Sequence, residues 1–507
     1  MQRKPIPDPA INAGIHLRQH KSPLIKYPMN EPAQKIPSLS SLRRRTVVSL
    51  LRTWREVKGS ARHAIGREVR PGLPKEDVEY LQKQMQLCFE SPGGEITERA
   101  HTAELGTIYL GLNEAGRARF LKILATEFDL DKAKLNRLTS TYSASASPAE
   151  AQKIEMELRQ ALVTPRSTIL RHFTALPDGF KFLVNMRADL LPLIGKDAML
   201  KGLEYDLKTI LSSWFDIGLL DLAEVTWNSP AALLEKLIEY EAVHRVTSWE
   251  DLKNRLDADR RVFAFVHNKM PLEPLIFVHV ALVQGMSDNI QHLLDVKSPL
   301  SDVEKADSAI FYSISNAQKG LAGISFGNFL IKRVVRELTE RMKNIKTFAT
   351  LSPVPGFRGW LDPLLLKGDE SVLLADERQA LHKLKKQDNP ARALHEIIEG
   401  NWVADKTLAD SLKPILMRLC AHYLVEQKKS AGKPSGPLDP VASFHLSNGA
   451  RLERMNWLGD TSPKGLRQSA GIMVNYHYKL DEIDDNHEDY VTDGKIVAGR
   501  QVRAYLK

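Results

Sequence analysis

Apolar and polar residues follow two different periods along this chain, and the change between them falls near residue 214. Between residues 41 and 213, apolar residues recur with helical spacing, and polar connections such as STYSASASP separate the segments. One segment, PKEDVEYLQKQMQLCFE, begins with a proline and carries early acids, as helix starts do. The pattern predicts a helical domain over 41–213. It shows no metal-ligand spacing and no nucleophile–base pair, so we expect it to serve packing or oligomerisation.

The chain outside this region divides into an N-terminal arm and a second domain. Residues 1–40 are polar and rich in proline, and we expect a flexible basic arm there. Over 214–507 the apolar runs become shorter and richer in β-branched residues. The runs RVFAFVH (261–267) and EPLIFVHVALV (273–283) are typical of a β-hairpin, and LLDLAEVTW favours a strand or a short helix. This part therefore predicts a mixed sheet.

The most informative stretch runs from Ala309 to Phe357. AIFYSIS predicts a buried strand, a glycine-rich turn follows, and IKTFATL predicts a second strand. Between them, four apolar residues at intervals of four predict one buried helix face: Leu330, Val334, Leu338 and Met342. Strands joined by a helix are normally parallel, so both loops should leave the carboxyl ends of neighbouring strands, where ligands bind.

The turn before this helix contains Gly320, Gly323 and Gly327. A glycine loop at a helix N-terminus can hold phosphates through backbone N–H groups, which favours a phosphorylated carrier substrate. The pattern matches neither a P-loop nor a GxGxxG motif. The alternative is a turn that needs positive φ and close helix packing.

Two further residues are candidates for the chemistry. Ser352 follows the second strand in a loop stiffened by Pro353 and Pro355, without a GxSxG motif, and the alternative is a turn or capping serine. His445 precedes an Asn448–Gly449 turn signal, so we expect it on a strand entering a hairpin. The alternative for this histidine is a half-buried structural residue. The residues alone leave both alternatives open.

The composition of the chain limits the kinds of partner that the protein can be expected to bind. The net charge is +9, but much of the basic excess lies in the first seventy residues, and no aromatic-interleaved basic face or DNA-reading motif is present. We therefore expect no nucleic-acid partner, although a helical interaction or nucleic-acid-binding protein with a basic arm stays open as a rival. No apolar run is long enough to span a membrane, so we expect no membrane partner.

The number and spacing of the cysteines and histidines indicate which cofactors and which cellular compartment to expect. Two cysteines, Cys88 and Cys420, exclude a disulfide framework and a cysteine-rich zinc site, and they fit a reducing compartment. No HExxH motif or carboxylate cluster stands out, so we expect no metal. No secretion signal is recognisable at the start. We expect a bacterial cytoplasmic protein, with the mitochondrial matrix as the alternative.

Longer motifs resemble the malonyl-CoA decarboxylase family. They occur in the family's order between about residues 273 and 478 and include EPLIFVHVAL, AIFYSIS, GNFLIKRVVREL, LSPVPGF, LMRLCAHYL, DPVASFHLSNGA, RMNW and NYHY. The resemblance implies an α+β architecture with two domains. An N-terminal helical bundle would mediate self-association, as a dimer or tetramer, and a GNAT-like mixed-sheet domain would carry catalysis. It also implies that the reaction uses no cofactor beyond the CoA of the substrate.

The resemblance also assigns site residues. Ser352 and His445 match the family's catalytic pair, and Ser313 and Tyr478 match further active-site positions. The CoA- and malonyl-binding loop matches Ala322, Gly323, Ile324, Ser325, Phe326, Gly327 and Asn328. Family members carry a glutamate at the position of Ser325, which bears on whether a carboxylate supports the pair and controls the protonation of His445.

The reaction implied is the conversion of malonyl-CoA to acetyl-CoA and CO2, a step of fatty acid and malonate metabolism. The carboxylate would leave a thioester enolate, and His445, whose unperturbed pKa lies near neutrality, would protonate it. Ser352 would bind the carboxylate or relay a proton. Lys332 or Arg333 would help the loop to bind the phosphates. The closest alternative is an acyl-CoA N-acyltransferase of GNAT type, which would share the fold and CoA but need an amine acceptor.

Overall fold

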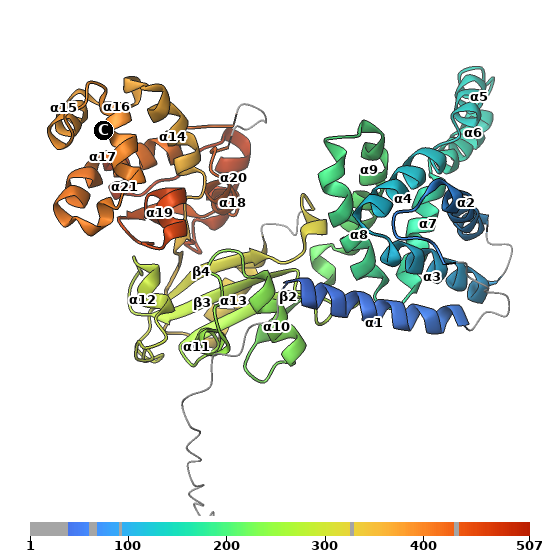
Figure 1. Cartoon of the computed structure of the whole chain (residues 1–507), viewed down its shortest axis with the longest axis horizontal. Coiled ribbons are helices and arrows are strands. Elements are labelled where there is room, and N and C mark those ends of the chain that lie inside the picture. Colours follow the sequence, from blue (N-terminus) through green and yellow to red (C-terminus); the bar gives the residue numbers. More distant parts are fainter. Residues whose placement is uncertain (1–38, 60–67, 91–93, 325–328, 430–435) are drawn as a thin grey trace, which may run out of the picture.

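The computed structural model describes residues 39–59, 68–90, 94–324, 329–429 and 436–507. Almost all of the arm expected over 1–40 lies outside this described part. Figure 1 shows a helical region at one end, a β-sheet in the middle and a second group of helices at the other end. Among the described helices, none combines the length and the apolar character that crossing a bilayer requires.

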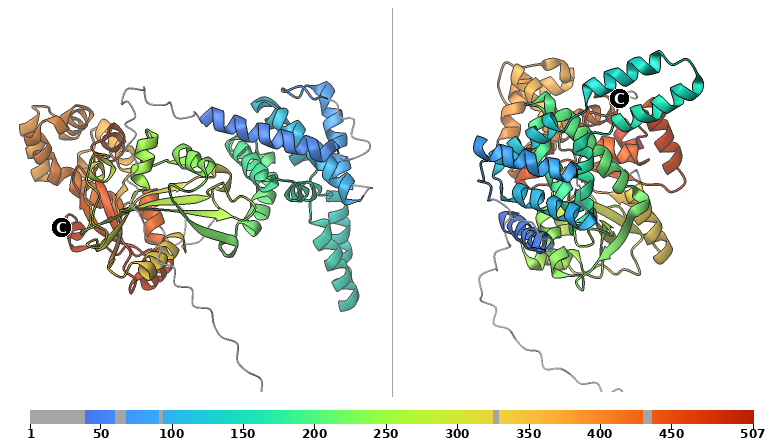
Figure 2. Two further views of the ribbon diagram at one scale, coloured as in Figure 1. Left: turned by 90° about the horizontal axis from the view of Figure 1, so that it is seen from below. Right: turned by 90° about the vertical axis from the view of Figure 1, so that its right-hand side faces the viewer.

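The N-terminal region is helical, as predicted. Its core contains Trp54, Tyr109 and Phe182, whose rings meet edge to face with centroids 4.9 and 5.5 Å apart. The helices α5 and α6 form a hairpin that projects away from the rest of this region (Figure 2). The described helices are α1 (Leu39–Gly59), α2 (Lys75–Glu90), α3 (Glu95–Gly111), α4 (Glu114–Glu127), α5 (Lys132–Ser143), α6 (Pro148–Ala161), α7 (Pro165–His172), α8 (Gly179–Ile194) and α9 (Lys201–Trp214).

The sheet follows α9 and is mixed, also as predicted. Its strands are β1 (Leu220–Val225), β2 (Arg260–His267), β3 (Ile276–Val283), β4 (Ser308–Asn316), β5 (Thr347–Thr350), β6 (Ser352–Pro353), β7 (Arg451–Asn456) and β8 (Met473–His477). They lie in the order β1-β2-β3-β4-β5-β8-β6, and β7 pairs with β8. The predicted hairpin is β2–β3, and LLDLAEVTW forms the strand β1 rather than a helix.

The predicted strand–helix–strand unit is β4–α13–β5, where α13 spans Phe329–Arg341. The two strands are parallel, with Phe311 paired to Thr350. The helix buries Leu330, Val334 and Leu338 against the sheet, so this part of the predicted apolar face is confirmed. Met342, the fourth residue predicted for the face, follows the last residue of α13 and is half-buried. Both strands therefore end at the same edge, and the loops that follow them lead to the predicted site residues.

The other helices surround the sheet and form the C-terminal region. They are α10 (Ala231–Tyr240), α11 (Trp249–Arg255), α12 (Ile290–Leu294), α14 (Phe357–Lys367), α15 (Ala375–Leu384), α16 (Pro390–Glu399), α17 (Lys406–Val425), α18 (Pro440–Ser447), α19 (Pro463–Ser469), α20 (Ile483–Asp493) and α21 (Arg500–Ala504). The domain boundaries expected at residues 40 and 213 stay predictions, although strand structure does begin soon after α9.

Two local expectations are wrong. His445 lies on the helix α18 instead of a strand, because Asp439 caps this helix by accepting hydrogen bonds from the Val441 and Ala442 amides (both 2.9 Å). Gly449, with φ of +81°, then leads from the helix to β7 rather than closing a hairpin. Ser352 lies on the short strand β6, paired with β8, instead of in an irregular loop.

Candidate active site

Ser352 is held on the sheet directly after β5. Alternation along the chain puts Thr350 and Ser352 on one face, and the Ser352 hydroxyl donates to Thr350 Oγ1 over 2.9 Å. Thr350 Oγ1 also accepts the backbone N–H of Tyr476 in β8 (3.1 Å). The side chain of Ser352 is thus fixed by two strands.

His445 comes to the same place from α18. Its Nε2 atom lies 3.2 Å from Ser352 Oγ, and its Nδ1 atom lies 2.7 Å from the hydroxyl of Tyr478, which directly follows β8. The ring stacks on Tyr476 with centroids 4.6 Å apart. The structure therefore brings together Ser352, His445 and Tyr478, three of the residues predicted for the site.

The donors and acceptors of this group form one consistent chain. Since the Ser352 hydroxyl donates to Thr350, its oxygen is free to accept from His445 Nε2–H. His445 Nδ1 then accepts the Tyr478 hydroxyl proton. This order defines the Nε2–H tautomer of the imidazole, with one proton pointing toward Ser352.

Burial controls the protonation of these groups. His445 is 2% exposed, and burial lowers its pKa to about 3. Burial also raises the pKa of Tyr478 well above its ordinary value. Both side chains are therefore neutral at pH 7. Desolvation thus moves the pKa of His445 away from the near-neutral value of an unperturbed imidazole, because burial disfavours the imidazolium.

Ser313 lies in a second polar cluster. Its hydroxyl donates to Glu241 Oε1 over 2.7 Å, and its cross-strand neighbour His279 lies 3.3 Å from Glu241 Oε2. Burial alone would raise the pKa of Glu241, but His279, the Ser313 hydroxyl and backbone amides together lower this pKa to about 2. Ser313 is thus hydrogen-bonded to a carboxylate that no sequence pattern had singled out.

The predicted substrate loop follows β4 and is described in part. Gly320 and Leu321 belong to the short 3-10 helix η4 (Lys319–Leu321), and Gly323 has a φ of +72°, which favours glycine. The described part of the predicted loop is Ala322, Gly323 and Ile324. The remaining predicted positions lie outside the described residues: Ser325, Phe326, Gly327 and Asn328.

The basic residues expected near the phosphates have protein partners. Lys332 Nζ lies 2.6 Å from Asp484 Oδ1. Arg333 donates to the Leu220 carbonyl over 2.9 Å, and its guanidinium lies 5.1 Å from the centre of the Phe265 ring. These contacts tie α13 to β1, β2 and α20, so both residues have structural roles.

Asp439 links the elements that carry the two members of the pair. Besides capping α18, its carboxylate accepts the backbone N–H of Gly356, four residues after Ser352, over 3.2 Å. It also accepts the hydroxyl of Tyr423, from α17. The Asp-Pro pair could have predicted that Asp439 caps a helix. No sequence pattern predicts its contact with Gly356.

One group of potential metal ligands occurs among the described residues. The ligand atoms of Asp362, His395 and Glu399 all lie within 4.8 Å of one another. Arg358 donates to Asp362 over 2.6 Å and also pairs with Glu399. Both carboxylates therefore have a cationic partner, and we assign no metal to this group.

A cleft of about 1200 Å³ opens where the helical region meets the sheet. Its lining includes Lys181 of α8 and the first residues after β4, among them Gln318 and Gly320. Lys181 Nζ donates to Gln318 Oε1 over 2.7 Å and lies 3.3 Å from Glu273 Oε2. The buried lysine of this cleft is thus paired with protein groups, and it connects the helical region to the segment that precedes the predicted loop.

Comparisons with known proteins agree with the motifs. The family profile described as "Malonyl-CoA decarboxylase C-terminal domain" matches residues 218–507. The profile described as "Malonyl-CoA decarboxylase N-terminal domain" matches residues 128–215. The two matches fall on either side of the change from helices to strands.

Relatives and solved structures match over most of the chain. Proteins named malonyl-CoA decarboxylase, mitochondrial, are 40% identical in Anser anser anser and 39% in Mus musculus. The alignments cover 86% of this chain and 89% and 92% of the relatives. Crystal structures of malonyl-CoA decarboxylase from Rhodopseudomonas palustris and Agrobacterium vitis each superpose with a TM-score of 0.76. They are 41% and 38% identical and cover 84% of this chain and 99% and 100% of theirs.

Proposed function

The chain belongs to the malonyl-CoA decarboxylase family, and we propose that Ser352 and His445 are the catalytic pair with which it performs the family reaction. The protein is a carboxy-lyase that converts malonyl-CoA to acetyl-CoA and CO2. The observation that carries the assignment of the pair is the chain of short contacts from Tyr478 through His445 to Ser352.

The chemistry sets two requirements. Malonyl-CoA carries a carboxylate β to the thioester carbonyl, so loss of CO2 leaves an enolate on the thioester. The site must stabilise the enolate oxygen and then deliver a proton to the carbon. A preorganised donor at a developing oxyanion contributes about 3 kcal/mol to the lowering of the barrier. In our proposal, His445 Nε2–H and the Ser352 hydroxyl exchange their partners in the free site, Ser352 Oγ and Thr350 Oγ1, for the malonyl group and become its donors.

The buried site supports this role of His445. An imidazole that is neutral at pH 7 leaves the site without a fixed positive charge. When a substrate carboxylate enters beside it, the negative charge favours the imidazolium and raises the pKa of His445. The site then takes up one proton from solvent together with the substrate. This proton is the one that the reaction consumes.

The proposed proton path balances. CO2 leaves with breakage of the C–C bond, and the bonding electron pair moves into the enolate. The carbon then takes a proton from His445 Nε2, directly or through the Ser352 hydroxyl, which leaves a neutral imidazole protonated on Nδ1. Uptake of the next proton from solvent at Nε2 restores the imidazolium for another turnover. Tyr478 keeps the ring oriented through Nδ1. No serine ester is formed, because decarboxylation needs no acyl transfer.

Other parts of the proposal concern ligands and assembly. We propose that the loop containing Ala322, Gly323 and Ile324 binds CoA, and that the reaction uses no metal or other cofactor. We also propose a dimer or tetramer assembled through the helical region. The protruding α5–α6 hairpin supports this assembly, because its described surface exposes Tyr142 and Met156. Light scattering of the purified protein tests the assembly.

The location of the protein is also a proposal. The animal relatives are named mitochondrial, and the two buried cysteines fit any reducing compartment. We propose the bacterial cytoplasm, with the mitochondrial matrix as the second candidate. Fractionation of the source cells distinguishes the two.

The deciding experiment uses mass spectrometry of malonyl-CoA in D2O, with EDTA and no added cofactor. We expect acetyl-CoA that carries one deuterium in its methyl group, and we expect this product to be lost in His445→Ala. An N-acyltransferase would instead release free CoA only when an amine is present. Undiminished turnover in His445→Ala would remove this residue from the mechanism, and loss of all turnover with EDTA would overturn the cofactor-free reaction.

A further inference from the structure

The helical region contacts the segment that starts the acyl-CoA loop. Arg187 of α8 is 1% exposed, and its Nη1 atom donates to the carbonyl oxygens of Gly320 (2.6 Å) and Ala322 (2.9 Å). Its Nη2 atom donates to Glu204 of α9 over 2.7 Å. A single guanidinium thus fixes two loop carbonyls and is itself anchored to the next helix.

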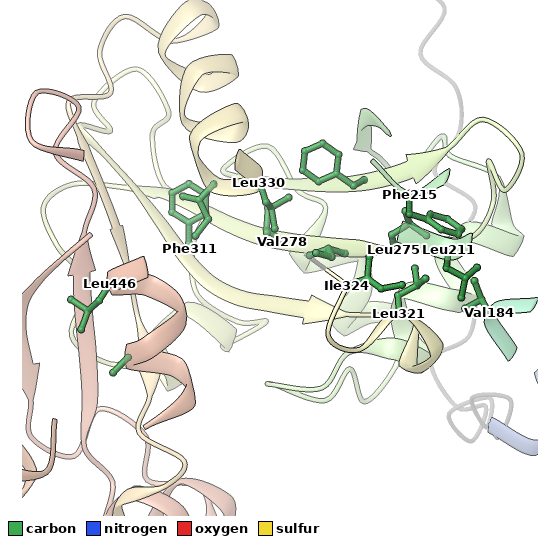
Figure 3. Packing of buried hydrophobic residues seen from close by; sticks show 14 of the residues in the cluster. Val184, Leu211, Phe215, Leu275, Val278, Phe311, Leu321, Ile324, Leu330 and Leu446 are labelled. Atoms are coloured by element: carbon green, nitrogen blue, oxygen red, sulfur yellow. The ribbon is translucent and has the colours of Figure 1, made fainter. Parts of the chain in front are cut away.

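At Gly320, the backbone of the segment after β4 lies so close to α8 that only a glycine fits there. A Cβ atom at Gly320 would lie 1.7 Å from the carbonyl oxygen of Val184, one turn from Arg187. Leu321 and Ile324 point into the same apolar cluster as Val184 and Leu211 (Figure 3). These contacts fix the position of the described loop segment relative to α8 and α9.

A further cation reaches the loop from α9. Lys208 Nζ lies 3.8 Å from the position that a Cβ atom would take at Gly323. This side chain is exposed, and it has no ion pair with any residue in the described ranges. An exposed ammonium on a long side chain, beside a glycine of positive φ, can reach an anion that approaches the loop.

We propose that α8 and α9 complete the acyl-CoA site: Arg187 is a positioning residue for the loop, and Lys208 binds the phosphates of CoA. This inference rests on the proposed CoA-binding role of the loop. Arg187 donates hydrogen bonds to the carbonyl oxygens of Gly320 and Ala322. Its positive charge offsets the partial negative charge of these oxygens, so they do not repel an anionic ligand. The helical region therefore contributes to substrate affinity besides any role in assembly.

The first test compares Arg187→Lys and Arg187→Met with the wild type. A lysine keeps the charge but does not bridge two carbonyls and a carboxylate in the fixed geometry of a guanidinium. We expect Arg187→Lys to raise the KM for malonyl-CoA about tenfold with kcat within threefold, and Arg187→Met to raise it further. The Kd of acetyl-CoA, measured by calorimetry, should rise in parallel.

The matched control is Arg166→Lys. Arg166 is also buried in the helical region, where it donates to the Ala125 carbonyl (2.7 Å) and to Asp206 (2.6 Å), and it does not touch the loop. We expect this variant to lose stability without a change in KM or Kd. An equal rise of KM in Arg166→Lys, or unchanged KM and Kd in both Arg187 variants, would overturn the positioning role.

The second test separates the phosphates from the acyl group. Lys208→Ala should raise the KM for malonyl-CoA about fivefold and leave that for malonyl-pantetheine, which has no phosphate, unchanged. Lys201→Ala, at the start of the same helix, should change neither. An equal effect on both substrates would remove Lys208 from the phosphate site. Because binding of acetyl-CoA does not require the chemical step, the Kd measurements stay interpretable even if the catalytic pair is wrong.

Discussion

His445 Nε2 lies 3.2 Å from Ser352 Oγ, although 93 residues separate the two in the chain. Two anchors produce this contact. Thr350 holds the serine hydroxyl on the sheet, and Asp439 ties the start of α18 to Gly356 just beyond the serine. The pair is therefore preorganised before any substrate binds, which is what stabilisation of a short-lived enolate requires.

Removal of either member of the pair should slow the chemical step. We expect His445→Ala and Ser352→Ala each to lower kcat by about 10²–10⁴-fold, because each removes a donor or proton carrier from the transition state. The affinity for CoA should change far less. Steady-state kinetics with malonyl-CoA measure this, and the exposed His382→Ala serves as control. A variant of the pair that keeps near wild-type kcat would contradict the assignment.

Two buried tyrosines allow a matched comparison. Tyr478→Phe removes the hydroxyl that donates to His445 Nδ1, so the imidazole loses its orientation and kcat should fall about tenfold. Tyr476→Phe removes a hydroxyl that has no hydrogen-bond partner among the described residues, while the ring still stacks on His445. Its kcat should stay within twofold. Similar losses in both variants would show that ring packing, rather than the hydroxyl of Tyr478, matters.

The low pKa of His445 links stability to pH. The pKa is about 3 in the folded protein and 6.5 in the unfolded chain. Between these values the unfolded chain binds more protons, so falling pH favours unfolding. This contribution to stability is complete above pH 6.5 and is lost as pH falls toward 3. The free energy of unfolding in urea, measured from pH 7 to pH 4, should therefore fall less steeply in His445→Gln than in the wild type. Parallel curves would show that His445 is not neutral in the folded state.

Asp439 should affect both stability and turnover. Asp439→Ala removes a helix cap and the acceptor for Gly356, so it should cost about 2 kcal/mol of unfolding free energy and lower kcat at least tenfold. Asp405→Ala removes the equivalent cap of α17, where the carboxylate accepts from Thr407 and Leu408. This control should cost about 1 kcal/mol and leave kcat unchanged. If kcat were equal in both variants, Asp439 would serve only as a helix cap and would not position the catalytic pair.

Local patterns predicted the regular elements that carry part of the candidate site. The β4–α13–β5 unit followed from two apolar runs and a four-residue period, and it placed Ser352 correctly beyond β5. Thr350 could also have been found, because it lies two residues before Ser352 and strand alternation puts both on one face.

Other parts had weak or misleading signals. Asn448–Gly449 is a strong hairpin signal, but here the capping of α18 by Asp439 decided the local structure. The contacts of Glu241 with Ser313 and of Arg187 with Gly320 join residues 72 and 133 positions apart. Such pairings depend on the packing of whole elements, and neither sequence period nor composition specifies them.

The apolar cluster that contains Val184, Leu211 and Leu446 runs without interruption from the helical region through the sheet to the C-terminal helices. The two regions matched by separate family profiles therefore share one cooperative core. Heating should melt both in a single calorimetric peak, and neither half should be recoverable as an autonomous fragment. A destabilising substitution anywhere in this core, however far from His445, would therefore lower the amount of the whole folded enzyme.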